Sequence, residues 1–162
     1  MKILNSGLKI FFWIILIISF DTKSDISVKE LDLKEVFKSG RSLMSLDNGL
    51  HYLEEELDIQ NVLFIGVHGS DSEGYEWIYP LITINDNQNL MSFFRYNDNL
   101  CPNRAYAYLS NEINRLLDQN KNIEQVVLMG HSYGAMIIAM FSETWINDCL
   151  LYTSPSPRDT AL

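Results

Sequence analysis

The feature that most constrains the fold of this chain is the run VVLMGHSYGAM, Val126–Met136. A short apolar run ends in the pentapeptide GHSYG, residues 130–134, and small and apolar residues follow it. This order predicts a buried strand that turns at once into a helix, with a serine at the turn. We expect a strained backbone at Ser132. We also expect glycine to be required at Gly130 and Gly134, because a Cβ there would meet the neighbouring strand or helix.

Three short apolar runs predict buried strands: NVLFIGV at 61–67, LMSFFRY at 90–96 and EQVVLM at 124–129. Between the last two runs, residues 103–119 predict an amphipathic helix, since apolar side chains recur at steps of three and four. They are Tyr106, Leu109, Ile113 and Leu116. Strands that alternate with helices favour parallel pairing through crossover connections. The expected fold class is therefore α/β.

Other segments are less regular. Residues 31–57 are expected to be largely helical, because Leu50, Leu53 and Leu57 fall at helical spacing after a possible cap at Asp47 or Asn48. The stretch YEWIYPLITI at 75–84 is ambiguous, since Pro80 interrupts it. Residues 85–89, NDNQN, indicate a turn. The segment 135–145 after the serine is apolar almost all round, which predicts a helix buried in the middle of the structure.

The composition excludes some classes of partner. The chain has 162 residues, 47% of them hydrophobic, which suits a single globular domain. It has 12 Lys and Arg residues and 21 Asp and Glu residues, which gives a net charge of −9. Such a surface repels phosphate backbones, so we expect no nucleic-acid partner. The two cysteines, Cys101 and Cys149, have no zinc-ligand spacing, and neither a metal nor a cofactor is expected.

The N-terminus predicts a targeting segment. Lys2 and Lys9 precede the uncharged run Ile10–Phe20. As a helix this run rises about 16 Å, well short of the roughly 30 Å hydrocarbon core of a bilayer. We therefore expect residues 1–24 to be a secretory signal and the protein to be exported, periplasmic or secreted. The alternative is an uncleaved membrane anchor formed by residues 10–20, which would be the only contact with a membrane.

The C-terminal segment 149–162 does not look like part of a domain. Residues 149–159, CLLYTSPSPRD, contain two Ser-Pro pairs and no periodicity, so no folded element is expected there. Translated back into codons, these eleven residues resemble one frame of a common transposase-type sequencing adapter. We therefore expect 25–148 to be a partial domain and 149–162 to be a non-native tail. A natural Ser/Pro-rich tail is the alternative.

A second motif suits acyl transfer. His68-Gly69-Ser70 follows the first predicted strand directly. Two fixed backbone N–H groups can stabilise the oxyanion that forms when a serine attacks a carbonyl carbon. One would come from Tyr133, the residue after the serine, and the other from Ser70 in the loop after the earlier strand. Gly69 would leave room for substrate, and His68 is expected to order this loop through hydrogen bonds rather than to act as the base.

Taken together, the order strand, His-Gly, strand, helix, strand and Gly-His-Ser-Tyr-Gly resembles the N-terminal half of the α/β-hydrolase fold, nearest to its lipases and esterases, over about residues 61–145. The resemblance implies a three-layer, doubly wound, mostly parallel sheet. It also implies a Ser-His-Asp or Glu triad that hydrolyses an ester or related acyl bond of a small molecule or lipid. Ser132 would be the nucleophile, with Ser70 and Tyr133 at the oxyanion hole. His131 would pack beside it.

The chain departs from this family after the serine. The family's triad runs in the order serine, acid, histidine, whereas His51, His68 and His131 all precede Ser132. The only acids between the serine and the tail, Glu143 and Asp148, lie on or just beyond the helix. We therefore expect the triad acid and histidine to be missing, the chain as given to be inactive, and the strand 126–129 to present an open apolar edge. The alternatives are a non-catalytic binding protein, an acyltransferase or a peptidase.

Overall fold

The computed structural model describes residues 26–54, 61–85, 89–145 and 151–153. The predicted signal segment, Asp148 and most of the tail lie outside these ranges, as does the middle of the predicted turn at 85–89.

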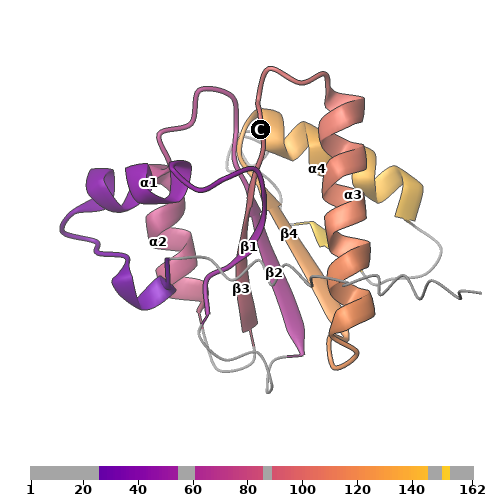
Figure 1. Ribbon diagram of the computed structural model, residues 1–162, viewed down its shortest axis with the longest axis horizontal. Coiled ribbons are helices and arrows are strands. Elements are labelled where there is room, and N and C mark those ends of the chain that lie inside the picture. The colour runs from indigo at the N-terminus through magenta and orange to yellow at the C-terminus, as the bar shows by residue number, and fades with distance from the viewer. Residues whose placement is uncertain (1–25, 55–60, 86–88, 146–150, 154–162) are drawn as a thin grey trace, which may run out of the picture.

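From residue 62 onward, strands and helices alternate along the described chain (Figure 1). A five-stranded sheet has the order β1-β3-β2-β4-β5, in which β1 is antiparallel to β3 and every other neighbouring pair is parallel. The α/β class is thus confirmed. The elements are the 3-10 turn η1 (Val28–Glu30), α1 (Val36–Met44), β1 (Gly49–Tyr52), β2 (Val62–Val67), α2 (Tyr75–Ile84), β3 (Asn89–Arg95), α3 (Pro102–Gln119), β4 (Gln125–Gly130), α4 (Tyr133–Trp145) and β5 (Leu151–Thr153).

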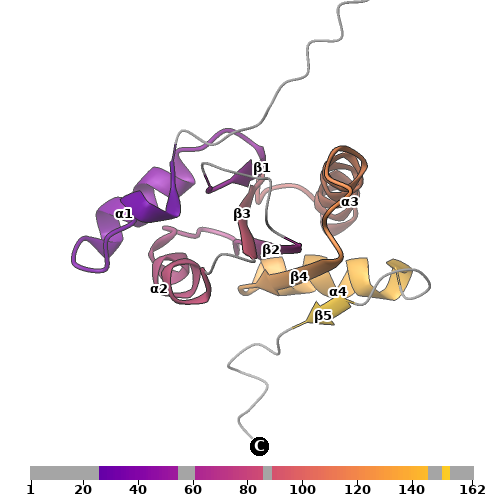
Figure 2. The same ribbon diagram turned by 90° about the horizontal axis from the view of Figure 1, so that it is seen from below.

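The helices cover both faces of the sheet, α1 and α2 on one side and α3 and α4 on the other (Figure 2). Because strand side chains alternate between faces, β2 contributes Leu63, Ile65 and Val67 to the core under α3 and α4, and Phe64 to the core under α1 and α2. Burial on both faces explains why the strands read as continuous apolar runs.

The predicted strands at 61–67, 90–96 and 124–129 correspond to β2, β3 and β4, and the predicted helix at 103–119 corresponds to α3. In α3, Leu109, Ile113 and Leu116 are buried, as their spacing predicts. The ambiguous stretch at 75–84 is helix α2 with Pro80 inside it. Trp77 of α2 is 3% exposed and its ring stands edge-on to Phe93, so it packs in the core.

The helical prediction for residues 31–57 is wrong in its second half. Gly49–Tyr52 is the edge strand β1, paired with β3 from Gly49↔Arg95 to Tyr52↔Ser92. Leu50 and Tyr52 belong to the core under α3 and α4, and Leu53 belongs to the core on the other face. Pairing with β3 therefore outweighs the helical spacing of Leu50 and Leu53.

Two further expectations fail at the end of the chain. The edge of β4 is not open, because Leu151–Thr153 of the predicted unstructured tail forms β5 and pairs with Val126–Leu128. Helix α4 is not buried all round. Ile137, Ile138 and Phe141 are buried, but Met136 is 42% exposed, since α4 lies in an outer layer and only one of its faces meets the core.

Candidate active site at the carboxyl edge of the sheet

The turn between β4 and α4 has the strained geometry that the sequence predicts. Ser132 is held at φ 54°, in the left-handed region that L-residues other than glycine rarely adopt. The turn is fixed by three backbone hydrogen bonds: His131 N to Val67 O at 3.1 Å, Gly134 N to His131 O at 2.9 Å, and Ala135 N to Ser132 O at 3.0 Å. Ser132 is exposed at the first turn of α4, where the helix dipole favours negative charge.

The two flanking glycines are required for close packing, as predicted. A Cβ on Gly130 would lie 2.5 Å from the Ala135 amide nitrogen. A Cβ on Gly134 would meet the Val67 carbonyl and lie 2.5 Å from the His68 carbonyl oxygen. Helix α4 thus begins directly against the carboxyl end of β2.

The loop after β2 lies against this turn. A Cβ on Gly69 would lie 2.9 Å from the His131 carbonyl oxygen and 3.0 Å from the Ser132 Cβ. Gly69 is therefore required for contact with the turn, while its role in leaving room for substrate stays a prediction. Among the described residues, the amides of Ser70 and Tyr133 donate no hydrogen bond. Tyr133 follows Ser132 directly, and Ser70 follows Gly69, which lies against Ser132.

His68 is buried and held by hydrogen bonds on both ring nitrogens. Its Nδ1 lies 2.7 Å from the Gly69 carbonyl oxygen, and its Nε2 lies 3.2 Å from both the Tyr96 amide nitrogen and an Arg95 guanidinium nitrogen. Burial is the main cause that lowers the pKa of His68, and the Arg95 charge lowers it further. The ring of His68 thus makes the hydrogen bonds within this loop that the sequence predicts, and its lowered pKa favours the neutral form.

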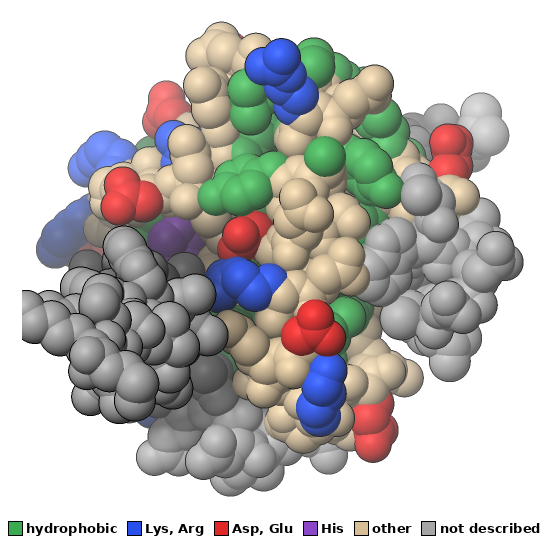
Figure 3. Space-filling model, turned by 45° about the vertical axis from the view of Figure 1, so that its right-hand side comes forward, with side chains coloured by type: hydrophobic (Ala, Val, Ile, Leu, Met, Phe, Trp, Pro, Cys, Tyr) green, Lys and Arg blue, Asp and Glu red, His purple; other side chains and the backbone are tan. Residues whose placement is uncertain are grey.

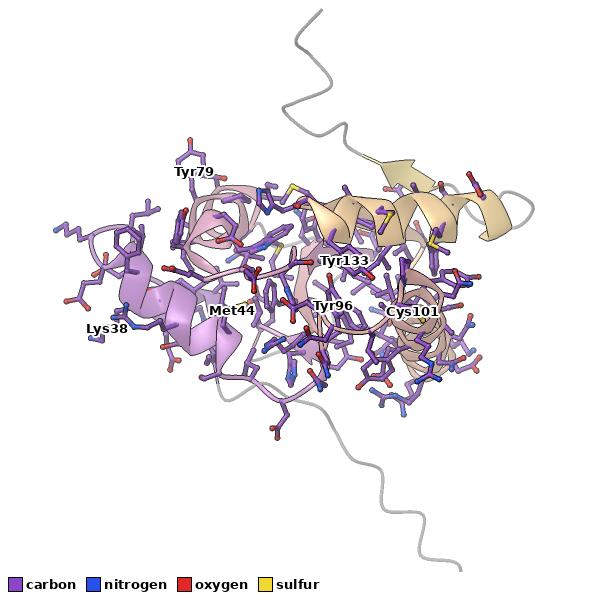
Figure 4. The ribbon with its side chains drawn as sticks, turned by 90° about the horizontal axis from the view of Figure 1, so that it is seen from above. Lys38, Met44, Tyr79, Tyr96, Cys101 and Tyr133 are labelled. Atoms are coloured by element: carbon purple, nitrogen blue, oxygen red, sulfur yellow. The ribbon has the colours of Figure 1, made fainter. Side chains whose placement is uncertain are left out.

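Residues after β3 complete this edge. The ring of Tyr96 stacks on that of His68 with centroids 4.2 Å apart and on that of Tyr133 at 6.4 Å. Its hydroxyl donates to the His68 carbonyl oxygen at 2.7 Å, while the Tyr133 hydroxyl donates to the Leu100 carbonyl at 2.6 Å. Figure 4, viewed from the carboxyl edge, shows Tyr96 and Tyr133 near one another at its centre. Burial raises the pKa of Tyr96, which keeps its phenol neutral.

Asp98 fixes the other end of the loop after β2. Its carboxylate accepts a 2.7 Å hydrogen bond from the Asp71 amide, and Asp71 is itself held at φ 51°. Sequence reasoning missed Arg95, Tyr96 and Asp98. A signal was available, because polar residues follow directly after a buried strand, and the carboxyl ends of parallel strands meet at one edge of the sheet.

The other histidines are not partners of the serine. His51 lies on β1, three strands from β4 or roughly 14 Å at the usual strand spacing, and its ring bonds the Asp47 carbonyl at 2.7 Å. His131 is exposed, so the prediction that it packs is wrong. Within the described chain, the Ser132 hydroxyl has no hydrogen-bond partner, and Glu143 is exposed on α4.

The described residues contain neither a metal-binding cluster nor a membrane-spanning helix. In the part of the chain that the structure describes, no group of three or more His, Cys, Asp or Glu residues could hold a metal ion. No described helix is long and apolar enough to cross a membrane.

Comparison with protein-family models, with curated proteins and with solved structures found no match. The function is therefore inferred from the site.

Proposed function

We propose that this chain carries the nucleophile and oxyanion-hole part of a serine hydrolase of the α/β-hydrolase type, acting on an ester or related acyl bond. The observation that carries the proposal is the strained backbone of Ser132 at the strand-to-helix turn, pressed against the loop of Gly69. A turn with structural use alone would not require a non-glycine residue at φ 54°, which costs about 1–2 kcal/mol.

The chemistry would begin with attack of the Ser132 Oγ on the carbonyl carbon of the substrate. The new bond forms as the hydroxyl proton passes to a base, and the electron pair of the C=O bond moves onto its oxygen. The amides of Ser70 and Tyr133 would donate to that oxyanion, for which about 3 kcal/mol per donor is typical. Expulsion of the alcohol leaves an acyl-enzyme, which water then hydrolyses.

The surface around the site fits a substrate with an apolar part. On the face shown in Figure 3, hydrophobic side chains gather in the upper part, toward the carboxyl edge of the sheet. Met136, one helical turn after Ser132, is 42% exposed. An acyl chain or an apolar alcohol could be held against such a surface.

The base must come from elsewhere. His68 is neutral and occupied at both nitrogens, and His51 lies on the far edge of the sheet. We propose that the triad acid and histidine are encoded beyond Asp148 at the source locus. The 162-residue chain is then expected to show only the residual catalysis of an oxyanion hole without a base.

The test begins with the sequence of the source locus past codon 148. We expect the frame to continue into further strands that carry an Asp or Glu and then a histidine in a late loop. A fluorophosphonate probe should label that longer protein at Ser132 and should not label its Ser132→Ala variant. A genome that encodes residues 149–162 followed by a stop, or efficient Ser132-dependent ester turnover by the 162-residue chain, would contradict the proposal.

One observation favours a second candidate, a non-catalytic binding protein that keeps the turn for its fold: the Ser132 hydroxyl has no partner among the described residues. A longer protein that lacks a late histidine, and that the probe does not label, would select this candidate.

A further inference from the structure

Arg95, at the end of β3, contacts three groups that belong to different segments. Its Nη1 donates to the Tyr96 carbonyl and lies 3.2 Å from the His68 Nε2. Its Nε donates to the Met44 carbonyl at the end of α1, at 3.1 Å. Arg95 is half-buried. The guanidinium thus links α1, β3 and the loop after β2.

These contacts determine which nitrogen of His68 carries the proton. The Tyr96 amide and the Arg95 guanidinium can only donate, so Nε2 must be the acceptor. The proton of the neutral ring then lies on Nδ1, where it is donated to the Gly69 carbonyl at 2.7 Å. With the proton on Nε2 instead, the Nε2–H would point at two other donors, the Tyr96 amide and the Arg95 guanidinium. The Gly69 carbonyl would then lose its hydrogen bond.

The bond to Gly69 also sets the direction of the next amide. The Gly69 carbonyl and the Ser70 N–H belong to one planar trans peptide, so they point in opposite directions. With its carbonyl held by the buried ring of His68, this peptide must direct the Ser70 N–H away from that ring. Ser70 is exposed, as is Ser132, and the Ser70 amide makes no hydrogen bond within the described chain.

We propose that Arg95 is a positioning residue for the oxyanion loop: together with the Tyr96 amide it donates to the His68 Nε2 and keeps the proton on Nδ1, and so fixes the Gly69–Ser70 peptide with its N–H free for a ligand oxygen. The value of that N–H to catalysis rests on the proposed function. The positioning itself does not rest on the proposed function, because it concerns only the His68 ring and the Gly69–Ser70 peptide.

The test is the tautomer of His68, read from the ¹⁵N shifts of its ring in a long-range ¹H–¹⁵N correlation spectrum of the whole chain. We expect the wild-type proton on Nδ1. Arg95→Met should raise the population of the Nε2–H form, because only the Tyr96 amide then donates to Nε2, and should shift the ¹H–¹⁵N resonance of the Ser70 amide as its peptide reorients. Arg95→Lys, which keeps a donor, should restore the wild-type pattern. Arg104→Met on the exposed start of α3 should change neither reading.

A double-mutant cycle separates positioning from general destabilisation. His68→Asn keeps a side-chain donor near the Gly69 carbonyl but loses the ring acceptor, so Arg95→Met should cause no further shift of the Ser70 amide resonance in that background. Equal effects of Arg95→Met in both backgrounds would overturn the proposal. A wild-type proton on Nε2 would overturn it without any variant. Failure of the longer protein from the source gene to hydrolyse esters would sink the proposed function and leave this result unaffected.

Discussion

At Ser132 the chain keeps a residue whose backbone would suit glycine. The strain at φ 54° is offset by the three hydrogen bonds of the turn and by the packing of α4 against β2. Strain that the surrounding structure maintains is typical of functional sites. It also gives Ser132 a measurable signature that is independent of catalysis.

We therefore expect Ser132→Gly to be more stable than Ser132→Ala by about 1 kcal/mol, because only glycine adopts this φ without a Cβ penalty. The matched pair at Ser110, inside α3, should show the opposite sign, with glycine about 1 kcal/mol less stable than alanine. Chemical denaturation of the four variants measures both differences. The same sign at both positions would show that Ser132 is unstrained.

His68 links the stability of the fold to pH. Its pKa in the folded protein lies below the ordinary 6.5, because of burial first, with Arg95 also lowering it and Asp98 and the bond to Gly69 opposing. The unfolded chain then binds more protons, so this stabilising contribution is complete above pH 6.5 and is lost as pH falls from 6.5 toward the lowered folded-state pKa.

We expect the free energy of unfolding to decrease between pH 7.5 and pH 5.5, with a slope from His68 of at most about 1.4 kcal/mol per pH unit. The His68→Asn variant should lose this part of the slope. The His51→Asn variant, whose ring bonds a backbone carbonyl near the protein surface, is the control and should keep it. Identical pH profiles for the two variants would exclude His68 as the linked group.

At the residue level, the sequence predicted the strain at Ser132 and the need for Gly130 and Gly134, because the strand-turn-helix pattern leaves little geometric freedom. It did not predict that His131 is exposed or that Arg95 and Asp98 brace the loop after β2. Those contacts depend on which strands become neighbours, and β2 and β3 are separated by helix α2 in the chain.

At the scale of elements, the junction of β2 with α4 is the tightest contact of the site. Gly134→Ala would drive a Cβ into the Val67 and His68 carbonyls, and backbone atoms cannot move aside without shifting β2 or α4. We expect a loss of at least about 3 kcal/mol in the free energy of unfolding.

Ser142→Ala, on the same helix, is the control for Gly134→Ala and should change stability by no more than about 0.5 kcal/mol. Thermal or urea denaturation measures both variants. A Gly134→Ala protein as stable as the control would mean that α4 does not begin against β2.

Elements differ in how far the sequence determines them. The strands β2, β3 and β4 are buried on both faces, so their apolar runs identify them. Strand β1 lies at the sheet edge and its apolar residues also fit a helical period, so only its pairing with β3 decides its conformation. Strand β5 is formed by three residues that pair with β4, and they lie in a segment without any periodic pattern. Nothing in that segment therefore predicts a strand.

At the scale of the whole molecule, β5 covers the edge of β4 that would otherwise expose unpaired N–H and C=O groups over Val126–Leu128. A chain shortened to end at Asp148 would lose this strand. We expect it to aggregate more than the 162-residue chain, because an open apolar edge can pair with another copy. Size-exclusion chromatography with light scattering compares the two chains. A monomeric shortened chain with an unchanged melting temperature would show that β5 does not protect the edge of β4 from association.

The central claim is that Ser132 is the nucleophile of an ester hydrolase, and the most direct measurement is kcat/KM for a p-nitrophenyl ester. It should be made with the protein expressed from the source gene read past codon 148, and with its Ser132→Ala variant. The account predicts hydrolysis that falls by at least about a thousandfold in the variant. Equal activity of the two proteins, or no activity in either, would contradict it.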